Sequence, residues 1–267
     1  MPKPKYWELQ DSTYAGLLER CAPGAHEAVG RMLVRHSLQP RPALDLAAGS
    51  GALLARMRDI GFRDLNAIEI DQKAFGLAGI TPRAIDLNTD FATSFSRQFG
   101  LITAVEIIEH LDSPRHFLRQ IWNLLEPDGY LLVTTPNISH WVGRLWFLIR
   151  GELRYFKKAD YENCRHISAI NDTHMRLILR EIGFEVIDFQ TAGSFYGPLK
   201  RAIAAPLSAA FRVACGPLSA GDTVIYLARK VEPDTTSPGR SSIEYIKNQY
   251  AKVSKPRDPA EAQSKPV

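Results

Sequence analysis

The sequence predicts an α/β protein in which helices cover both faces of one sheet. Short apolar strands alternate with helical segments over residues 1–230, a pattern typical of a buried, mostly parallel sheet. A small-residue loop at 47–51 joins the first of these strands to a helix. The chain has 267 residues, 45% of them hydrophobic, so it can bury one substantial core without disulfide or metal staples.

Glycine and proline mark the boundaries of the predicted elements. Pro40 and Pro42 separate the first long helix from a strand, and Gly61 ends the helix that follows the loop. Pro114 lies in the first turn of a later helix, where its missing N–H costs nothing. The predicted strands are 43–47, 65–70, 83–86, 99–105, 130–134, 184–189 and 224–228, and the predicted helices are 25–38, 52–59, 71–79, 114–125 and 172–181.

The C-terminal segment 231–267 differs in composition from the rest of the chain. It contains prolines at 233, 238, 256, 259 and 266 among serine, threonine and charged residues. Such a segment buries too little apolar surface to offset its ordering entropy, so we expect it to be disordered. A short helix at 243–250 that forms on contact with a partner is the alternative. We therefore expect one domain, at 1–230, followed by a tail.

Composition excludes several classes of protein. The 33 basic and 29 acidic residues give a net charge of +4, too small and too scattered for a nucleic-acid binder. Three distant cysteines form no CxxC pair, which favours a reducing cytoplasm. The sequence also shows neither a signal peptide nor an apolar run long enough to span a membrane. We expect a cytoplasmic protein.

The loop at 47–51 has the features of a cofactor-binding turn. Gly49 and Gly51 would let a ligand approach the backbone closely. Leu54 occupies the position where the dinucleotide fingerprint needs a third glycine, and the carboxylate of Asp45 would repel a pyrophosphate. These residues disfavour NAD and favour a cationic ligand such as S-adenosylmethionine, which carries an ammonium and a sulfonium.

Six segments, in order and spacing, resemble the class I S-adenosylmethionine-dependent methyltransferases over most of residues 22–230. Ala47 stands where the family's first motif usually has its first glycine. The resemblance implies a Rossmann-like fold with a mostly parallel seven-stranded sheet whose last strand runs antiparallel. The six segments are the loop 44–51, the acidic segment 67–71, the Asp-Leu-Asn at 86–88, the strand 99–106, the Ile-Glu-His-Leu at 108–111 and the segment 124–137.

The resemblance assigns roles to particular residues of the cofactor site. Glu69 would accept hydrogen bonds from both ribose hydroxyls, and Asp86 with the amide of Leu87 would hold the adenine. The alternatives are a helix cap for Asp45, an ordinary strand-end acid for Glu69 and a turn-forming residue for Asp86. The implied cofactor-binding residues are Asp45, Ala47, Gly49, Gly51, Glu69, Asp86, Leu87 and Glu106.

Histidines are the candidates for the catalytic base. Methyl transfer requires alignment of the acceptor, and an oxygen acceptor also loses a proton, which favours a base with a pKa near 7. His110, beside Glu109, follows the fourth strand, and His166 follows a long connection. Purely structural hydrogen bonds are the alternative for both histidines. We predict no metal site, because no His, Cys and carboxylate spacing is convincing, although a single Mg²⁺ held by Glu and Asp remains open.

Two segments indicate the acceptor. Residues 141–150 and 199–215 mix Lys or Arg with apolar residues, as interfacial helices and pocket lids do. The resemblance implies acceptor-cap elements at about 137–170 and 192–220; lid helices packed on the core are the plainer interpretation. The motifs are most similar to ubiquinone-biosynthesis O-methyltransferases, which implies a small or lipid-linked quinol-like hydroxyl acceptor and contact with the inner face of a membrane. The alternatives are a sugar or polyketide-like acceptor, or a non-catalytic S-adenosylmethionine-binding module.

Overall fold

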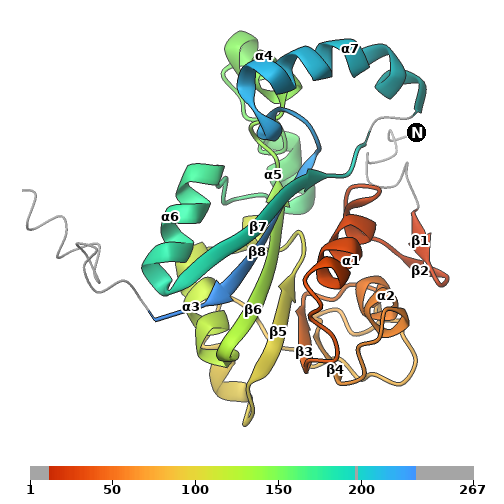
Figure 1. Ribbon diagram of the computed structural model, residues 1–267, viewed down its shortest axis with the longest axis vertical. Helices are drawn as coiled ribbons and strands as arrows, with labels where there is room; N and C mark the ends of the chain where they lie inside the picture. The colour runs from red at the N-terminus through yellow and green to blue at the C-terminus, as the bar shows by residue number, and fades with distance from the viewer. Residues whose placement is uncertain (1–11, 196–197, 233–267) are drawn as a thin grey trace, which may run out of the picture.

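The computed structural model describes residues 12–195 and 198–232, which form one α/β unit (Figure 1). The tail predicted to be disordered lies, apart from its first residues, outside the described part of the chain. Among the described residues, no helix combines the length and hydropathy that crossing a bilayer requires.

A six-stranded sheet in the order β4-β3-β5-β6-β8-β7 organises the molecule. The first four of these strands are parallel, and β8 runs antiparallel to both β6 and β7. The expected antiparallel last strand is therefore confirmed. The bounds are β3 (Ala43–Leu46), β4 (Leu65–Ile68), β5 (Phe99–Ala104), β6 (Leu125–Pro136), β7 (Phe184–Ala192) and β8 (Thr223–Lys230).

The prediction of seven strands is wrong. The segment 83–86 forms only an isolated parallel bridge between Arg83 and Ile68. Pro82, directly before it, has no N–H to donate to a ladder. The helix predicted at 71–79 is also absent. Gly76 and Gly79 lower its helix propensity, and the N–H of Gly76 donates to the Ser50 carbonyl at 3.0 Å instead.

Helices cover both faces of the sheet, and each face has its own apolar cluster. On one side, α3 (Pro114–Leu124) and α6 (Asp172–Ile182) pack through residues such as Phe117 and Leu179. On the other side, α1 (Ala25–Arg35) and α2 (Ala52–Asp59) pack through residues such as Met32. Figure 1 shows these two pairs on opposite sides of the strands. Both faces of the parallel strands are therefore buried, as predicted.

The remaining elements lie near the carboxyl ends of the strands, beside α2 or against α3. Trp141 of α4 stacks on Phe211 of α7 with ring centroids 5.4 Å apart, and its Nε1 donates to Ser208 Oγ at 3.0 Å. These two helices form an arm above the sheet (Figure 1). The elements are the hairpin β1 (Thr13–Tyr14) and β2 (Leu17–Leu18), α4 (Trp141–Arg150), α5 (Lys158–Cys164), α7 (Pro198–Cys215), and the 3₁₀ turns η2 (Phe91–Ser94), η3 (Ile108–His110) and η4 (Pro217–Ser219).

Candidate active site

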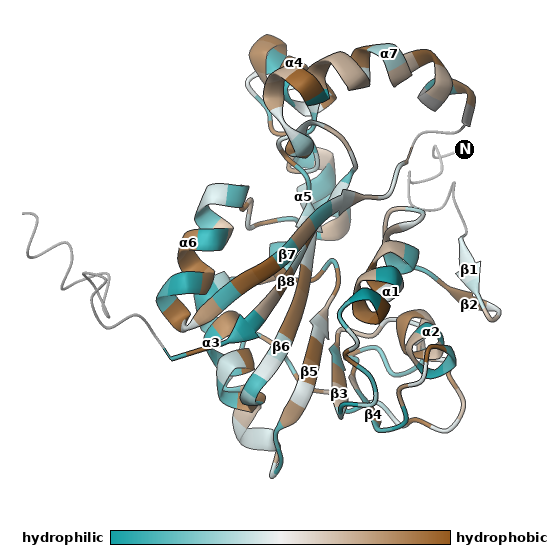
Figure 2. Cartoon of the chain, in the orientation of Figure 1, coloured by the Kyte–Doolittle hydropathy of each residue, from teal (hydrophilic) through white to brown (hydrophobic). Residues whose placement is uncertain are grey.

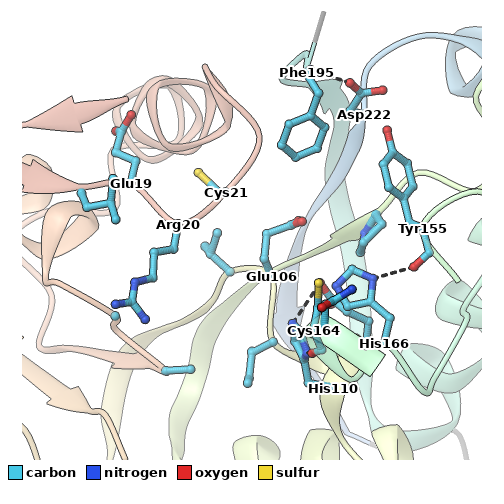
Figure 3. Close-up of a pocket in the computed structure, with 18 of the residues that line it drawn as sticks. Glu19, Arg20, Cys21, Glu106, His110, Tyr155, Cys164, His166, Phe195 and Asp222 are labelled. Carbon is cyan, nitrogen blue, oxygen red and sulfur yellow. Dashed lines mark hydrogen bonds and ion pairs between the residues drawn. The ribbon is translucent and has the colours of Figure 1, made fainter. Parts of the chain in front are cut away.

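A cavity of about 590 Å³ opens at the carboxyl ends of β3, β4 and β5, the edge where α/β sheets bind ligands. Figure 3 shows Arg20 and Cys21 on one side of it, Tyr155, His110 and His166 on the other, and Glu106 between. Seven residues that the sequence singled out line this cavity: Ala47, Gly49, Glu69, Glu106, Glu109, His110 and His166.

The loop after β3 turns sharply beside the cavity. Ala47 and Gly49 have φ angles of 60° and 56°, in the left-handed region that favours glycine. A Cβ on Gly49 would meet only Arg20 Cδ, at 3.7 Å, so Gly49 leaves room on the cavity side. A Cβ on Gly51 would lie 2.7 Å from Leu77 Cβ. Gly51 is therefore required by packing at the start of α2, and it lies outside the cavity lining.

Glu69 connects the end of β4 to this loop. Its Oε2 accepts the N–H of Gly49 at 2.7 Å, and its Oε1 accepts the N–H of Asp71 at 2.8 Å. The side chain is 8% exposed and lines the cavity. An ionised carboxylate offers about four lone-pair sites, so two remain for ligand hydroxyls. A carboxylate held rigidly at the cavity wall fits the ribose of S-adenosylmethionine.

Asp45 lies in β3, two residues before the loop, and its carboxyl group is buried beneath it. It is 2% exposed, and Thr103 Oγ1 donates to its Oδ1 at 2.6 Å. Burial raises the pKa of its carboxyl to about 7, although the Thr103 hydrogen bond opposes the shift. Asp45 lines a smaller adjoining cavity of about 30 Å³. It is not the cap of α2, because that position belongs to Gly51.

Asp86 and Leu87 lie outside the lining of the large cavity. Asp86 is exposed, and its Oδ1 accepts the N–H of Asn88 at 2.9 Å, which is the turn-forming role left open as its alternative. Leu87 is buried in the core cluster on the α3 side. The adenine-binding role of these two residues stays a prediction.

Glu106 stands at the centre of the cavity with a strained backbone. Its φ is 50°, uncommon for a residue other than glycine and often found at functional sites. Thr134 Oγ1 donates to Glu106 Oε1 at 2.8 Å and accepts the Glu106 N–H at 2.9 Å. Burial raises the pKa of Glu106 to about 7, and the charge of Asp222 adds to the shift. The carboxyl can therefore gain or lose a proton near neutral pH.

His110 and His166 lie on the opposite side of the cavity from Arg20 (Figure 3), and one ligand atom of Glu109 lies within 4.8 Å of a ring nitrogen of each. The two imidazole rings meet edge to face with centroids 4.8 Å apart. His110 Nε2 lies 3.9 Å from Glu109 Oε1. The N–H of Ile167 donates to the Glu109 carbonyl at 2.9 Å, and this backbone contact brings the segment after α5 against η3.

Burial changes the protonation of all three side chains. It raises the pKa of Glu109 well above its usual range, and the nearby Glu106 adds to the effect. It lowers the pKa values of His110 and His166 below their ordinary range, so both imidazoles are neutral at pH 7.

Sequence reasoning missed several residues that line the cavity. Asp222 is 2% exposed, pairs with Arg154 Nη1 at 3.0 Å and accepts the Phe195 N–H at 2.7 Å. Asp222 thereby holds Phe195 in place at the cavity wall. These residues lie outside the recognisable motifs, so the sequence carried no local signal for them. The missed lining residues with polar, sulfur or aromatic side chains are Glu19, Arg20, Cys21, Tyr155, Asn163, Cys164, Phe195 and Asp222.

A Rossmann-like sheet with a tight loop after β3 and an acid after β4 is typical of proteins that bind a nucleoside-containing cofactor at this edge of the sheet. A family model described as "Methyltransferase domain" matches residues 6–188. The chain therefore belongs to this methyltransferase family. It is a class I methyltransferase whose cofactor is S-adenosylmethionine, which confirms the class and the cofactor that the sequence predicted.

Curated relatives share parts of the chain. It is 25% identical over 175 residues to the ubiquinone biosynthesis O-methyltransferase of Acinetobacter baylyi, covering 61% of this chain and 71% of that protein. It is 28% identical over 110 residues to the Bordetella avium protein of the same name, covering 38% of this chain and 45% of that one. The latter match thus spans less than half of the relative's length.

Solved structures share the fold. The chain resembles a SAM dependent methyltransferase from Archaeoglobus fulgidus with a TM-score of 0.54 and 16% identity, over 77% of this chain and 95% of that one. It also resembles magnesium protoporphyrin IX methyltransferase from Synechocystis PCC 6803, solved with bound SAH, with a TM-score of 0.50 and 15% identity, over 77% and 81% of the two chains. At these identities the likeness establishes the fold alone.

Proposed function

We propose that this methyltransferase methylates a hydroxyl oxygen of a small or lipid-linked, quinol-like acceptor. The observation that carries the proposal is the convergence of Glu109, His110 and His166 across the cavity from Gly49, whose neighbour is Arg20. The cavity therefore has two sides. One side carries the loop backbone and Glu69 and suits the cofactor, and the other carries the two imidazoles and suits a hydroxyl acceptor.

On the cofactor side, Ala47, Gly49 and Glu69 hold S-adenosylmethionine, which supplies an electrophilic methyl group. Glu69 accepts hydrogen bonds from the ribose hydroxyls with its remaining lone pairs. Asp45 fixes the loop from beneath through Thr103, at 2.6 Å. Asp86 and the amide of Leu87 would hold the adenine; the resemblance of the motif supports this role, and both residues lie outside the cavity lining.

On the acceptor side, His110 removes the hydroxyl proton. Its Nδ1 is 2.6 Å from the Cys164 carbonyl, so Nδ1 carries the ring proton and Nε2 keeps a free lone pair. The lowered pKa keeps the ring neutral and able to accept a proton at pH 7. Glu109 and His166 orient the acceptor beside it.

Apolar side chains on the arm support a lipid-linked acceptor. Leu148 and Ile149 of α4 are 82% and 75% exposed, and Ile203 of α7 is 73% exposed. Figure 2 shows hydrophobic segments along both helices. Arg144, Lys200 and other basic residues lie on the same two helices. We propose that α4, α5 and α7 form the acceptor cap of a single domain at 1–230, and that the arm touches the inner face of a membrane.

The test is an acceptor screen with S-adenosylmethionine carrying a labelled methyl group. We offer a prenylated catechol-type quinol, the same ring without the prenyl chain, its O-methylated derivative, and a monosaccharide. Transfer to the free hydroxyl of the quinols, and none to the blocked derivative, is expected. Transfer to the sugar alone would contradict the quinol-like acceptor, and transfer to a nitrogen acceptor alone would contradict O-methylation.

A further inference from the structure

Three potential metal ligands meet on the acceptor side of the cavity. One ligand atom from each of Glu109, His110 and His166 lies within 4.8 Å of the others. Glu109 is fully buried, and neither of its carboxylate oxygens has a hydrogen-bond partner among the described residues. A buried carboxyl group without a hydrogen-bond partner costs free energy in either protonation state, which points to a partner that binds at this position.

Both histidines are held in the tautomer that a metal ligand needs. His110 Nδ1 lies 2.6 Å from the Cys164 carbonyl, and His166 Nδ1 lies 2.6 Å from the Tyr155 carbonyl. A carbonyl only accepts, so each Nδ1 donates and each Nε2 keeps its lone pair. Backbone carbonyls that bind the distal N–H are the usual supports of metal-ligating histidines.

The cluster brings several lone pairs together without donors between them. The lone pairs of His110 Nε2 and His166 Nε2 and the two carboxyl oxygens of Glu109, which have no hydrogen-bond partner among the described residues, share one buried space. A cation bound between them would satisfy all three groups at once.

We propose that Glu109, His110 and His166 bind one divalent transition-metal cation, with Zn²⁺ as the probe. Two imidazole nitrogens and one carboxylate oxygen suit zinc and its neighbours better than Mg²⁺, which prefers oxygen ligands. Three protein ligands leave a further position open toward the cavity. This proposal differs from the expectation of no metal site, because the 55 residues between His110 and His166 hid the grouping in the sequence.

The geometry needs only a small adjustment. Bonds of about 2.0–2.1 Å to a tetrahedral ion place ligand atoms about 3.4 Å apart. The ligand atoms are now up to 4.8 Å apart, so side-chain rotations that move them by little more than 1 Å would bring them to the distance that the ion requires. The ion would hold the acceptor oxygen and favour loss of its proton to water. His110 Nε2 would then bind the ion and would no longer be the atom that accepts the proton. That role rests on the proposed function, whereas binding of the ion does not.

The test is calorimetric titration of Zn²⁺ into the full chain after removal of metal with a chelator. We expect one ion per chain, and an affinity at least about tenfold lower in both His166→Ala and Glu109→Gln. His174→Ala, which removes an exposed histidine outside the cluster, is the matched control and should bind as the wild type does. S-adenosylmethionine binding and the far-UV spectrum of each variant report whether it folds.

The outcomes separate this inference from the proposed function. Absence of zinc binding, or equal affinity in the wild type and His166→Ala, would overturn the metal site. If one of these two results is found and the chelator-treated protein still transfers methyl groups at the full rate, the metal site is overturned and the proposed function stands. Zinc binding that the cluster variants weaken, with no transfer to any hydroxyl, would support the site and overturn the proposed function.

Discussion

Glu69 Oε2 accepts the peptide N–H of Gly49 at 2.7 Å. This bond joins the acid at the end of β4 to the tight turn after β3, so the two features that mark the cofactor side form one unit. The same carboxylate also accepts the N–H of Asp71, which leaves its orientation little freedom. Because the carboxylate is already held in place, binding a ligand hydroxyl costs it little further conformational entropy.

Replacing Glu69 should weaken cofactor binding. Hydrogen bonds to a charged group contribute about 1.5–3 kcal/mol each, so Glu69→Ala should raise the dissociation constant of S-adenosylmethionine at least about tenfold. Calorimetry measures the change. Asp71→Ala is the control, because Asp71 is exposed and its contact with Glu69 uses only the backbone. An unchanged constant in Glu69→Ala would remove Glu69 from the cofactor site.

The two loop glycines should respond differently to substitution. Gly49→Val places a branched side chain at the cavity wall, and we expect lost cofactor binding with the fold retained, apart from about 1–2 kcal/mol of backbone strain. Gly51→Ala brings a Cβ to 2.7 Å from Leu77, so stability should fall by about 1–3 kcal/mol or more. Urea unfolding and calorimetry on both variants test this, and tight cofactor binding by Gly49→Val would contradict the loop assignment.

Asp45 should make stability fall as pH rises. Its folded pKa of about 7 lies above the unfolded value of 3.8, so the folded state holds the extra proton between these values. The favourable contribution is present at low pH and is lost as pH rises through 7. Between pH 5 and 8, Asp45→Asn should therefore gain on the order of 2–3 kcal/mol relative to wild type.

Urea unfolding at several pH values measures this relative gain. Asp112→Asn changes an exposed carboxyl and should follow the wild type. Parallel curves for Asp45→Asn and wild type would show that the Asp45 carboxyl titrates at the same pH in the folded and unfolded states.

The arm should bind anionic vesicles. Changing both Leu148 and Ile149 to Glu removes two exposed apolar side chains from α4, each worth about 1.5–3 kcal/mol if buried in lipid. Cosedimentation with phosphatidylglycerol vesicles should fall at least about tenfold, and binding of the wild type should weaken with salt. Leu177→Glu, on α6 and 54% exposed, is the control. Equal sedimentation of wild type and the double variant would contradict membrane contact through α4.

The local signals of the sequence predicted most of the sheet and one side of the site. The helix at 52–59 and the strand ends that carry Gly49, Glu69 and Glu106 follow from glycine placement and apolar runs. The strand predicted at 83–86 is wrong. Only Arg83 of this segment pairs with the sheet, through an isolated bridge to Ile68.

The acceptor side was less predictable. His110 and His166 meet through long-range backbone bonds from Ile167 and Ser168 to the Glu109 carbonyl, both 2.9 Å, which no local pattern encodes. Asp222 and Phe195 likewise reach the cavity only because β7 and β8 pair in the sheet.

The most direct test of methyl transfer at the imidazole side is the turnover of His110→Ala with the labelled cofactor and a quinol acceptor. A group that removes the acceptor proton, directly or through a bound ion, contributes about 10²–10⁴-fold. We expect a loss of this size with an unchanged dissociation constant for S-adenosylmethionine, and wild-type turnover in His174→Ala. Full turnover by His110→Ala would contradict the placement of the reaction at this side of the cavity.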